Sequence, residues 1–320
     1  MNVIKKSLLI AIVMLAAYHF LLPHLSHKFY QINGLQRGNY LRAQRYLYDI
    51  PDKTNVIVGS SMSLELNDQT LGPSYFKLSL PGGSIQTALE IIRRSKKRPS
   101  VLLIETNNLE WDVDRGFVED LFNPYLFELR RHSAIFREEG RPSNFVVGIT
   151  EAIVRKACQF NAGPGERAEL AKHSDAPAAR LSGQLFGKIM DINRETLQHA
   201  SPPALLAKHA NRLGEVVDAL ANEGSKCVFF EMPFDDSLMD LPLPAATRKA
   251  VAARFPGDKY SWLRFARDHN YETVDGIHLV RPEADGVTKV FLQQVADVVQ
   301  ESKQSSPHIH ALAHESQSSQ

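Results

Sequence analysis

The sequence predicts an α/β protein built around a mainly parallel sheet, and three observations point to this class. Short apolar runs alternate with amphipathic stretches of helical length along most of the chain. Most of these runs are almost wholly apolar, which is typical of strands that helices cover on both faces. Hydrophobic residues make up 43% of the 320 residues, enough to build such a core.

The first three strands are expected at Asn55–Val58, Tyr75–Leu80 and Val101–Glu105. The first is a β-branched run that Gly59 ends, and the second alternates apolar and polar residues. A helix is expected over Ser84–Lys97, because its apolar residues recur on one face. Strand, helix and strand in this order favour parallel pairing.

The region from about 111 to 203 does not keep this rhythm. It holds the helical stretches Phe145–Cys158 and Arg180–Met190, separated by polar, Gly- and Ala-rich loops such as Asn161–Pro177. We interpret it as an inserted helical cap over the strand ends.

The alternation resumes after the insertion. The expected elements are a helix at Ala204–Asn222, a strand at Cys227–Met232, a helix at Pro244–Arg254, the segment Tyr260–His269, a last strand around Tyr271–Val274 and a closing helix at Glu283–Gln300.

The N-terminus predicts the compartment. Lys5 and Lys6 precede the uncharged run Ser7–Leu22, which is slightly short for a membrane span and slightly long for the core of a signal peptide. Lysines before the run predict that the N-terminus stays inside and the bulk of the chain outside. Because Leu15-Ala16-Ala17 is a poor cleavage site, we expect an uncleaved signal anchor, with a cleaved signal peptide as the alternative.

The expected organisation is therefore a signal anchor at 1–27, a connector at 28–54, a main domain at 55–300 that carries the insertion at about 111–203, and a disordered tail at 301–320. The connector either packs on the domain or lies on the membrane surface. The expected location is the inner (cytoplasmic) membrane, crossed once, with the main domain in the periplasm or outside the cell.

Charge and cysteine content exclude several classes of protein. Lys and Arg number 37 against 36 Asp and Glu, so no basic excess indicates nucleic-acid binding. The two cysteines, Cys158 and Cys227, exclude a disulfide-rich scaffold and a multi-cysteine zinc module. One bridge between them remains possible, but Cys227 lies in an apolar run and is expected to be a buried free thiol. Neither a cofactor nor a metal is expected.

Four short polar segments follow predicted strands, where ligands of parallel sheets bind. Gly59-Ser60-Ser61-Met62 offers a nucleophilic serine, Pro81-Gly82-Gly83-Ser84 offers backbone N–H groups, and Asn107-Asn108 offers an amide donor. Asp275-Gly276-Ile277-His278 places a carboxylate beside an imidazole, which suits a general base. Taken alone, each segment is explained more simply as a helix cap or a turn than as part of an active site. Their order along one edge of one sheet favours chemistry.

These residues resemble the SGNH (GDSL-type) hydrolase superfamily, whose named elements come in the same order. The resemblance covers roughly Asn55–Thr106 and Tyr271–Gln300, with Cys227–Met232 as an intervening core strand. It implies a three-layer, flavodoxin-like sheet, and it makes 55–300 an SGNH-like catalytic domain.

Two positions depart from the family pattern. Gly59-Ser60-Ser61 stands where the family often has Gly-Asp-Ser, so that Ser60 replaces an acid. Glu105-Thr106-Asn107-Asn108 stands where many members have Gly-x-Asn-Asp. The lost glycine leaves open whether Asn107 or Asn108 is the oxyanion donor.

The resemblance implies a catalytic triad of Ser61, His278 and Asp275, with an oxyanion hole formed by the N–H groups of Ser61 and Gly82 and by the Asn107 amide. Acyl-Ser61 would pass its acyl group to a sugar hydroxyl or to water. The same elements serve an O-acyltransferase and an esterase.

The N-terminal anchor makes the chain similar to accessory proteins of exopolysaccharide O-acetylation and to the protein that assists teichoic-acid D-alanylation. That similarity implies an O-acyltransferase, acetyl being the expected group, with a polysaccharide acceptor and a multi-span membrane acyltransferase as donor. A membrane-anchored carbohydrate or lipid esterase is the first alternative, and a non-catalytic scaffold of an export complex the second. Trp111 and Tyr125 of the cap are further candidates for stacking on sugar rings, although packing is the simpler expectation.

Overall fold

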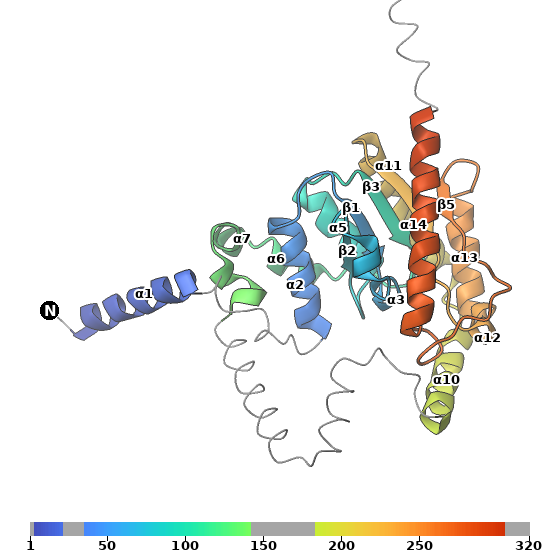
Figure 1. Ribbon diagram of the computed structural model, residues 1–320, viewed down its shortest axis with the longest axis horizontal. Coiled ribbons are helices and arrows are strands. Elements are labelled where there is room, and N and C mark those ends of the chain that lie inside the picture. The colour runs from blue at the N-terminus through green and yellow to red at the C-terminus, as the bar shows by residue number, and fades with distance from the viewer. Residues whose placement is uncertain (1–2, 22–34, 142–182, 305–320) are drawn as a thin grey trace, which may run out of the picture.

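The sheet of this protein has five strands, all parallel, in the order β2-β1-β3-β4-β5. The computed structural model describes residues 3–21, 35–141 and 183–304 (Figure 1). The strands are β1 (Asn55–Gly59), β2 (Tyr75–Ser79), β3 (Val101–Glu105), β4 (Lys226–Phe230) and β5 (Ser261–Leu263). The predicted α/β class and parallel sheet are thus confirmed.

The strand order is that of doubly wound sheets in which the chain turns from one side of β1 to the other. β1 pairs with β2 through Gly59 opposite Ser79, and with β3 through Val58 opposite Ile104. Ligands of such sheets bind at the carboxyl ends of the strands beside this reversal, which here lies between β1 and β3.

Helices cover both faces of the sheet (Figure 1). Alternate residues of β1 point to opposite faces, so Val56 and Val58 join one apolar core and Ile57 joins the other. The first core contains side chains of α2 (Leu35–Tyr48), α5 (Ile85–Ser95), α6 (Arg115–Leu121), α11 (Pro203–Asn222) and α13 (Pro242–Arg254). The second contains side chains of α3 (Ser61–Leu64), α4 (Asp68–Leu71), α10 (Gly183–Gln198), α12 (Asp236–Met239) and α14 (Arg281–Gln304).

One predicted strand is wrong. Tyr271–Val274 forms only an isolated antiparallel bridge, between Thr273 and Leu279, and the fifth strand is instead β5. The β-branched composition of 271–274 is real, but the chain reverses directly after it. Val274 N–H donates to the carbonyl of His278 at 2.7 Å, which closes a tight loop instead of extending the sheet.

The insertion is divided between two places. Its described elements are α6, α7 (Pro124–His132), two short 3-10 turns (Ala134–Phe136 and Glu138–Gly140) and α10. α6 packs in the first core rather than over the strand ends, whereas α10 lies near them. The predicted helix Phe145–Cys158 and the loop Asn161–Pro177 fall outside the described residues.

The two ends of the chain were predicted in part. The connector packs on the domain as α2, with Ala43, Tyr46 and Leu47 buried. The predicted tail is wrong at its start, because α14 continues to Gln304, and 305–320 lie outside the described residues. α1 (Val3–Leu21) occupies the expected N-terminal segment. In the part of the chain that the structure describes, no helix is both long and apolar enough to cross a membrane.

Candidate active site

Ser61 lies two residues beyond the end of β1, at the first position of the short helix α3. The side chain of Ser60 caps this helix by accepting the N–H of Met62 at 3.1 Å. The turn is sharp because an apolar strand, a glycine and a helix cap follow one another within a few residues. It leaves the Ser61 side chain partly exposed above the sheet edge.

The structure brings Ser61, His278 and Asp275 together. His278 Nε2 lies 2.8 Å from Ser61 Oγ, and His278 Nδ1 lies 2.7 Å from Asp275 Oδ2. The second carboxylate oxygen of Asp275 accepts the backbone N–H groups of Ile277 at 3.0 Å and His278 at 2.8 Å. A carboxylate on Nδ1 favours the tautomer that leaves Nε2 free to accept the serine proton.

The pKa values of this pair move apart in the directions that the geometry requires. Burial raises the pKa of Asp275, but hydrogen bonds from the side chain and backbone of His278 outweigh it and lower the pKa to about 2. The hydrogen bond to Asp275 raises the pKa of His278, against the opposing effect of burial. The negative charges of Glu65 and Glu105 raise the pKa of His278 further.

The loop that carries Asp275 and His278 is held from several sides. Gly276, at φ 95°, occupies the left-handed region that favours glycine, and its N–H donates to Thr273 Oγ1 at 3.0 Å. Asp235 N–H donates to the Gly276 carbonyl at 3.1 Å, and Asn193 of α10 donates to the Asp275 carbonyl at 2.9 Å. The general base is therefore fixed by contacts outside its own loop.

Glu105 is a functional candidate that the sequence reasoning treated only as a departure. Its side chain is fully buried at the end of β3, and both oxygens face the turn that holds Ser61. Ser60 donates its N–H at 2.9 Å and its Oγ–H at 2.6 Å, and Ser63 donates its N–H at 3.0 Å. The signal in the sequence was an acid that ends an otherwise apolar buried strand.

Gly59 makes room for this carboxylate. A Cβ at Gly59 would overlap Oε2 of Glu105 and Oγ of Ser63. The glycine before the serine pair is thus required by the close approach of β3.

The backbone amides of the turn identify one free donor. The N–H groups of Ser60 and Ser63 donate to Glu105, and that of Met62 donates to Ser60 Oγ. Within the described residues, the Ser61 N–H has no such acceptor. It is the amide of this turn that remains available for a developing oxyanion.

The other two predicted oxyanion donors are placed less favourably. Both amide atoms of Asn107 are engaged by the backbone of Met232, with Nδ2 donating at 2.9 Å and Oδ1 accepting at 2.8 Å. The Asn107 amide keeps one further N–H, and Asn108 lines the same pocket. Gly82 lines a different pocket, of about 220 Å³, together with Leu35 and Asn39. Its role as a donor stays a prediction.

A pocket of about 230 Å³ opens over Ser61 and His278. Its wall is mostly apolar, and α10 contributes to it, as do side chains after β3 and from α13. The apolar lining comprises Met62, Trp111, Leu197, Phe234, Leu243, Pro244 and Ile277. Of the two predicted aromatic residues, Trp111 thus reaches this triad pocket, whereas Tyr125 projects from α7 into solvent with 83% of its surface exposed.

Cys227 is a free cysteine whose thiol pKa is raised by burial to about 12, whereas Cys158 lies outside the described residues. No group of three or more potential ligands suited to a metal ion occurs among the residues that the structure describes.

The fold and the site define an α/β protein with a hydrogen-bonded Ser-His-Asp arrangement at the carboxyl edge of a parallel sheet. No protein-family model and no curated protein matches the chain. The functional assignment therefore depends on the geometry of the site.

Proposed function

We propose that this protein is a serine-dependent O-acyltransferase of the SGNH type that modifies a polysaccharide, with acetyl as the expected group. The observation that carries the proposal is the continuous chain from Asp275 through His278 to Ser61, with separations of 2.7 and 2.8 Å. A nucleophile, a base in hydrogen-bond reach and a third group that orients the base form the arrangement of nucleophilic acyl transfer.

The reaction follows from these positions in two halves. His278 Nε2 takes the proton of Ser61 Oγ as that oxygen attacks the carbonyl carbon of an acyl ester. The tetrahedral oxyanion is stabilised by the Ser61 N–H, and its collapse breaks the bond to the leaving oxygen, which receives the proton from His278. A sugar hydroxyl then gives its proton to His278 and attacks acyl-Ser61. Collapse of this second intermediate breaks the acyl–Oγ bond, and Ser61 Oγ takes the proton back from His278 as the acylated sugar leaves.

The wall of the triad pocket supports an acyl substrate. Its apolar side chains surround a volume of about 230 Å³ next to Ser61. Such a site accommodates a short acyl group and limits the access of water to the acyl-enzyme.

We extend the proposal to location and partners. The main domain lies outside the cytoplasm, held by a single N-terminal membrane anchor, and a multi-span membrane acyltransferase supplies the acyl group. The support is the sequence alone, in which Lys5 and Lys6 precede the apolar run Ser7–Leu22. Fusing a reporter active only outside the cytoplasm to the C-terminus tests it, and an inactive reporter with a normally folded fusion would contradict it.

The proposed reaction is tested with the full-length protein and 4-nitrophenyl acetate, in the presence and absence of an oligosaccharide mixture. We expect release of nitrophenolate, an acetylated Ser61 peptide in mass spectrometry and acetyl groups on sugar. Ser61→Ala should abolish all three. Ser100→Ala is the matched control, because Ser100 precedes β3 at the opposite edge of the sheet and its hydroxyl donates to the Lys53 carbonyl, away from Ser61.

The other outcomes separate the alternatives. Acetate as the only product would replace the transferase with an esterase. Equal inertness of the wild type and Ser61→Ala would refute acyl transfer with this donor and favour a scaffold.

A further inference from the structure

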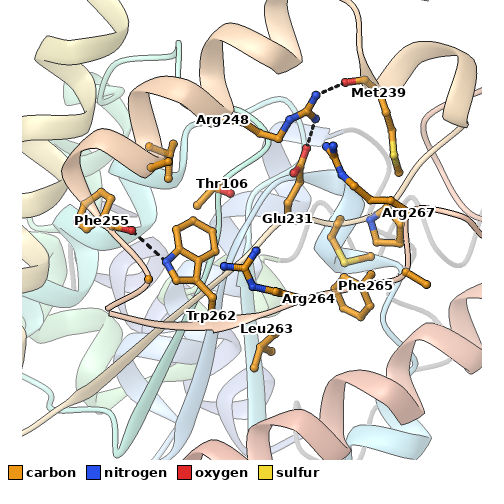
Figure 2. A pocket seen from close by; sticks show the side chains of 16 residues that line it. Thr106, Glu231, Met239, Arg248, Phe255, Trp262, Leu263, Arg264, Phe265 and Arg267 are labelled. Atoms are coloured by element: carbon orange, nitrogen blue, oxygen red, sulfur yellow. Dashed lines mark hydrogen bonds and ion pairs between the residues drawn. The ribbon is translucent and has the colours of Figure 1, made fainter. Parts of the chain in front are cut away.

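A second and larger pocket adjoins the triad pocket. It has a volume of about 500 Å³ and lies between α13 and the chain that follows β5 (Figure 2). The two pockets share Thr106, Glu231 and Arg248 as lining residues. The two pockets are therefore neighbours with a common wall. The larger one has a volume within the usual range of small-molecule sites, about 300–1,000 Å³.

The charge of this arginine pocket, as we name it, is positive. Among the described residues that line it, the charged ones are Arg248, Arg264, Arg267 and a single acid, Glu231. Arg248 is neutralised, since it bonds to Glu231 at 2.8 Å and to Asp240 at 3.0 Å. Two guanidinium groups remain.

The two remaining arginines differ in their surroundings. Arg267 lies 3.8 Å from Asp240, whose side chain is 83% exposed and does not line the pocket. Within the described residues, the Arg264 guanidinium has no carboxylate partner, and Arg264 lines the pocket together with Trp262 and Leu263 (Figure 2). The pocket thus presents positive charge without an equal negative charge inside it.

The floor of the arginine pocket is apolar and rigid. Trp262 donates its indole N–H to the carbonyl of Phe255 at 3.0 Å, and its ring packs on Phe229 with centroids 5.3 Å apart. Because the indole is fixed on one side, its pocket-facing surface is a preformed platform for a ring. Apolar and aromatic lining with a few converging charged groups is the composition of a ligand site.

The common wall controls where an anion can sit. Glu231 stands in that wall, and Glu110 lines the triad pocket. The Glu231 carboxylate is paired with Arg248, so it is the Glu110 carboxylate that repels an anion from the surroundings of Ser61. Arg264 and Arg267 attract it into the neighbouring compartment, because guanidinium groups bind carboxylate and phosphate in a two-point geometry.

We infer that the arginine pocket binds an acidic group of the acceptor glycan, with a sugar ring against Trp262, while a hydroxyl of the same chain reaches acyl-Ser61 across the Glu231–Arg248 wall. This inference rests on the proposed acyltransferase function. The chemistry recognised is an oxyanion on a sugar, which a uronic acid carboxylate and a phosphodiester both supply.

Binding is measured on full-length Ser61→Ala, which separates it from turnover. The probes are an oligogalacturonate, a neutral oligogalactose of the same length and an oligomeric glycerol phosphate. We expect at least one acidic probe to bind about tenfold or more tightly than the neutral one, and salt to weaken it. Tighter binding of the galacturonate indicates a carboxylate, and tighter binding of the glycerol phosphate indicates a phosphodiester.

Variants assign the binding to the pocket. Arg264→Gln with Arg267→Gln, added to Ser61→Ala, should weaken the acidic probe about tenfold or more and leave the neutral probe unchanged. Arg93→Gln with Arg131→Gln is the control of equal charge, because both arginines are about half exposed, on α5 and α7, and pair within their own helices.

The two proposals fail differently. Equal binding of acidic and neutral probes, or equal loss in the control pair, overturns the arginine pocket even if Ser61 becomes acetylated. Absence of acetyl-Ser61 in the wild type overturns the acyltransferase, and the binding result still reports on the pocket.

Discussion

The substitution Glu105→Gln tests whether a buried carboxylate positions the nucleophile. Glu105 is fully buried and accepts three hydrogen bonds, two from Ser60 and one from Ser63, on either side of Ser61. Glutamine has nearly the same shape, so it removes the charge and one acceptor oxygen without opening a cavity.

The magnitude follows from these contacts. A hydrogen bond to a charged group contributes about 1.5–3 kcal/mol, and the variant loses at least one of them, so the free energy of unfolding should fall by about that amount. A displacement of the Ser61 hydroxyl of the order of 1 Å costs roughly 10²-fold in rate. Because the charge of Glu105 raises the pKa of His278, its removal should lower that pKa. The acid limb of the rate profile should therefore move to lower pH.

The assay is the pH dependence of kcat/KM for 4-nitrophenyl acetate, together with urea denaturation. Glu215→Gln is the control, because Glu215 lies on the exposed side of α11. A slower enzyme whose acid limb has shifted supports positioning by charge. Wild-type rate with an unshifted limb would refute the reasoning, and a slower enzyme with an unshifted limb would reduce Glu105 to a structural role.

Four further predictions follow from the same site. Asp275→Asn should lower kcat by roughly 10⁴-fold, because an amide no longer fixes the tautomer of His278, and steady-state kinetics measure it. The pKa of Asp275 falls from 3.8 to about 2 on folding. The ionised carboxylate therefore stabilises the folded state above pH 3.8, and this stabilisation is lost as the pH falls towards 2. The stability difference between wild type and Asp275→Asn in urea should shrink over that range, and a constant difference would contradict the assignment. Gly59→Ala should lower the melting temperature and the rate together, because its methyl group displaces the carboxylate of β3; a variant as stable as wild type would disprove that close approach. Asn107→Ala should lower stability by about 1–3 kcal/mol through two lost backbone bonds, and whichever of Asn107→Ala and Asn108→Ala costs roughly 10²–10³ in kcat at matched stability identifies the oxyanion donor.

The sheet was predictable because its strands carry a local signal. β3 was predicted to the residue, and β1, β2 and β4 within two residues at each end, since each is a short apolar run bounded by a turn. β5 was missed because Ser261–Leu263 is only three residues long, and its pairing with β4 is a tertiary contact that no local pattern announces. The same limit applies to Tyr271–Val274, where strand-like composition forms a reversal.

For the site, the order of residues along the chain suggested the candidates, but the sequence could not show which of them touch. Ser61, His278 and Asp275 could be chosen because each follows an expected strand, yet only the fold places them within hydrogen-bond distance. Ser60 and Glu105 were read singly as departures from the SGNH pattern, but they contact each other at 2.6 Å. The two positions that read as separate departures in the sequence are thus one contact in the structure, between the serine after β1 and the acid that ends β3.

α10 gives the insertion two connected effects. Its residues Thr196 and Leu197 form part of the pocket wall, while Asn193 holds the carbonyl of Asp275 and Met190 packs against Gly276. Sequence change on this helix can therefore alter which substrate fits, and through the neighbouring turn it can also alter how the base is held. Substitutions at Thr196 and Leu197 that keep Asn193 and Met190 should change substrate selectivity and leave the position of the general base unchanged. The strands of the sheet come from other segments, so substitutions on α10 should leave the sheet intact.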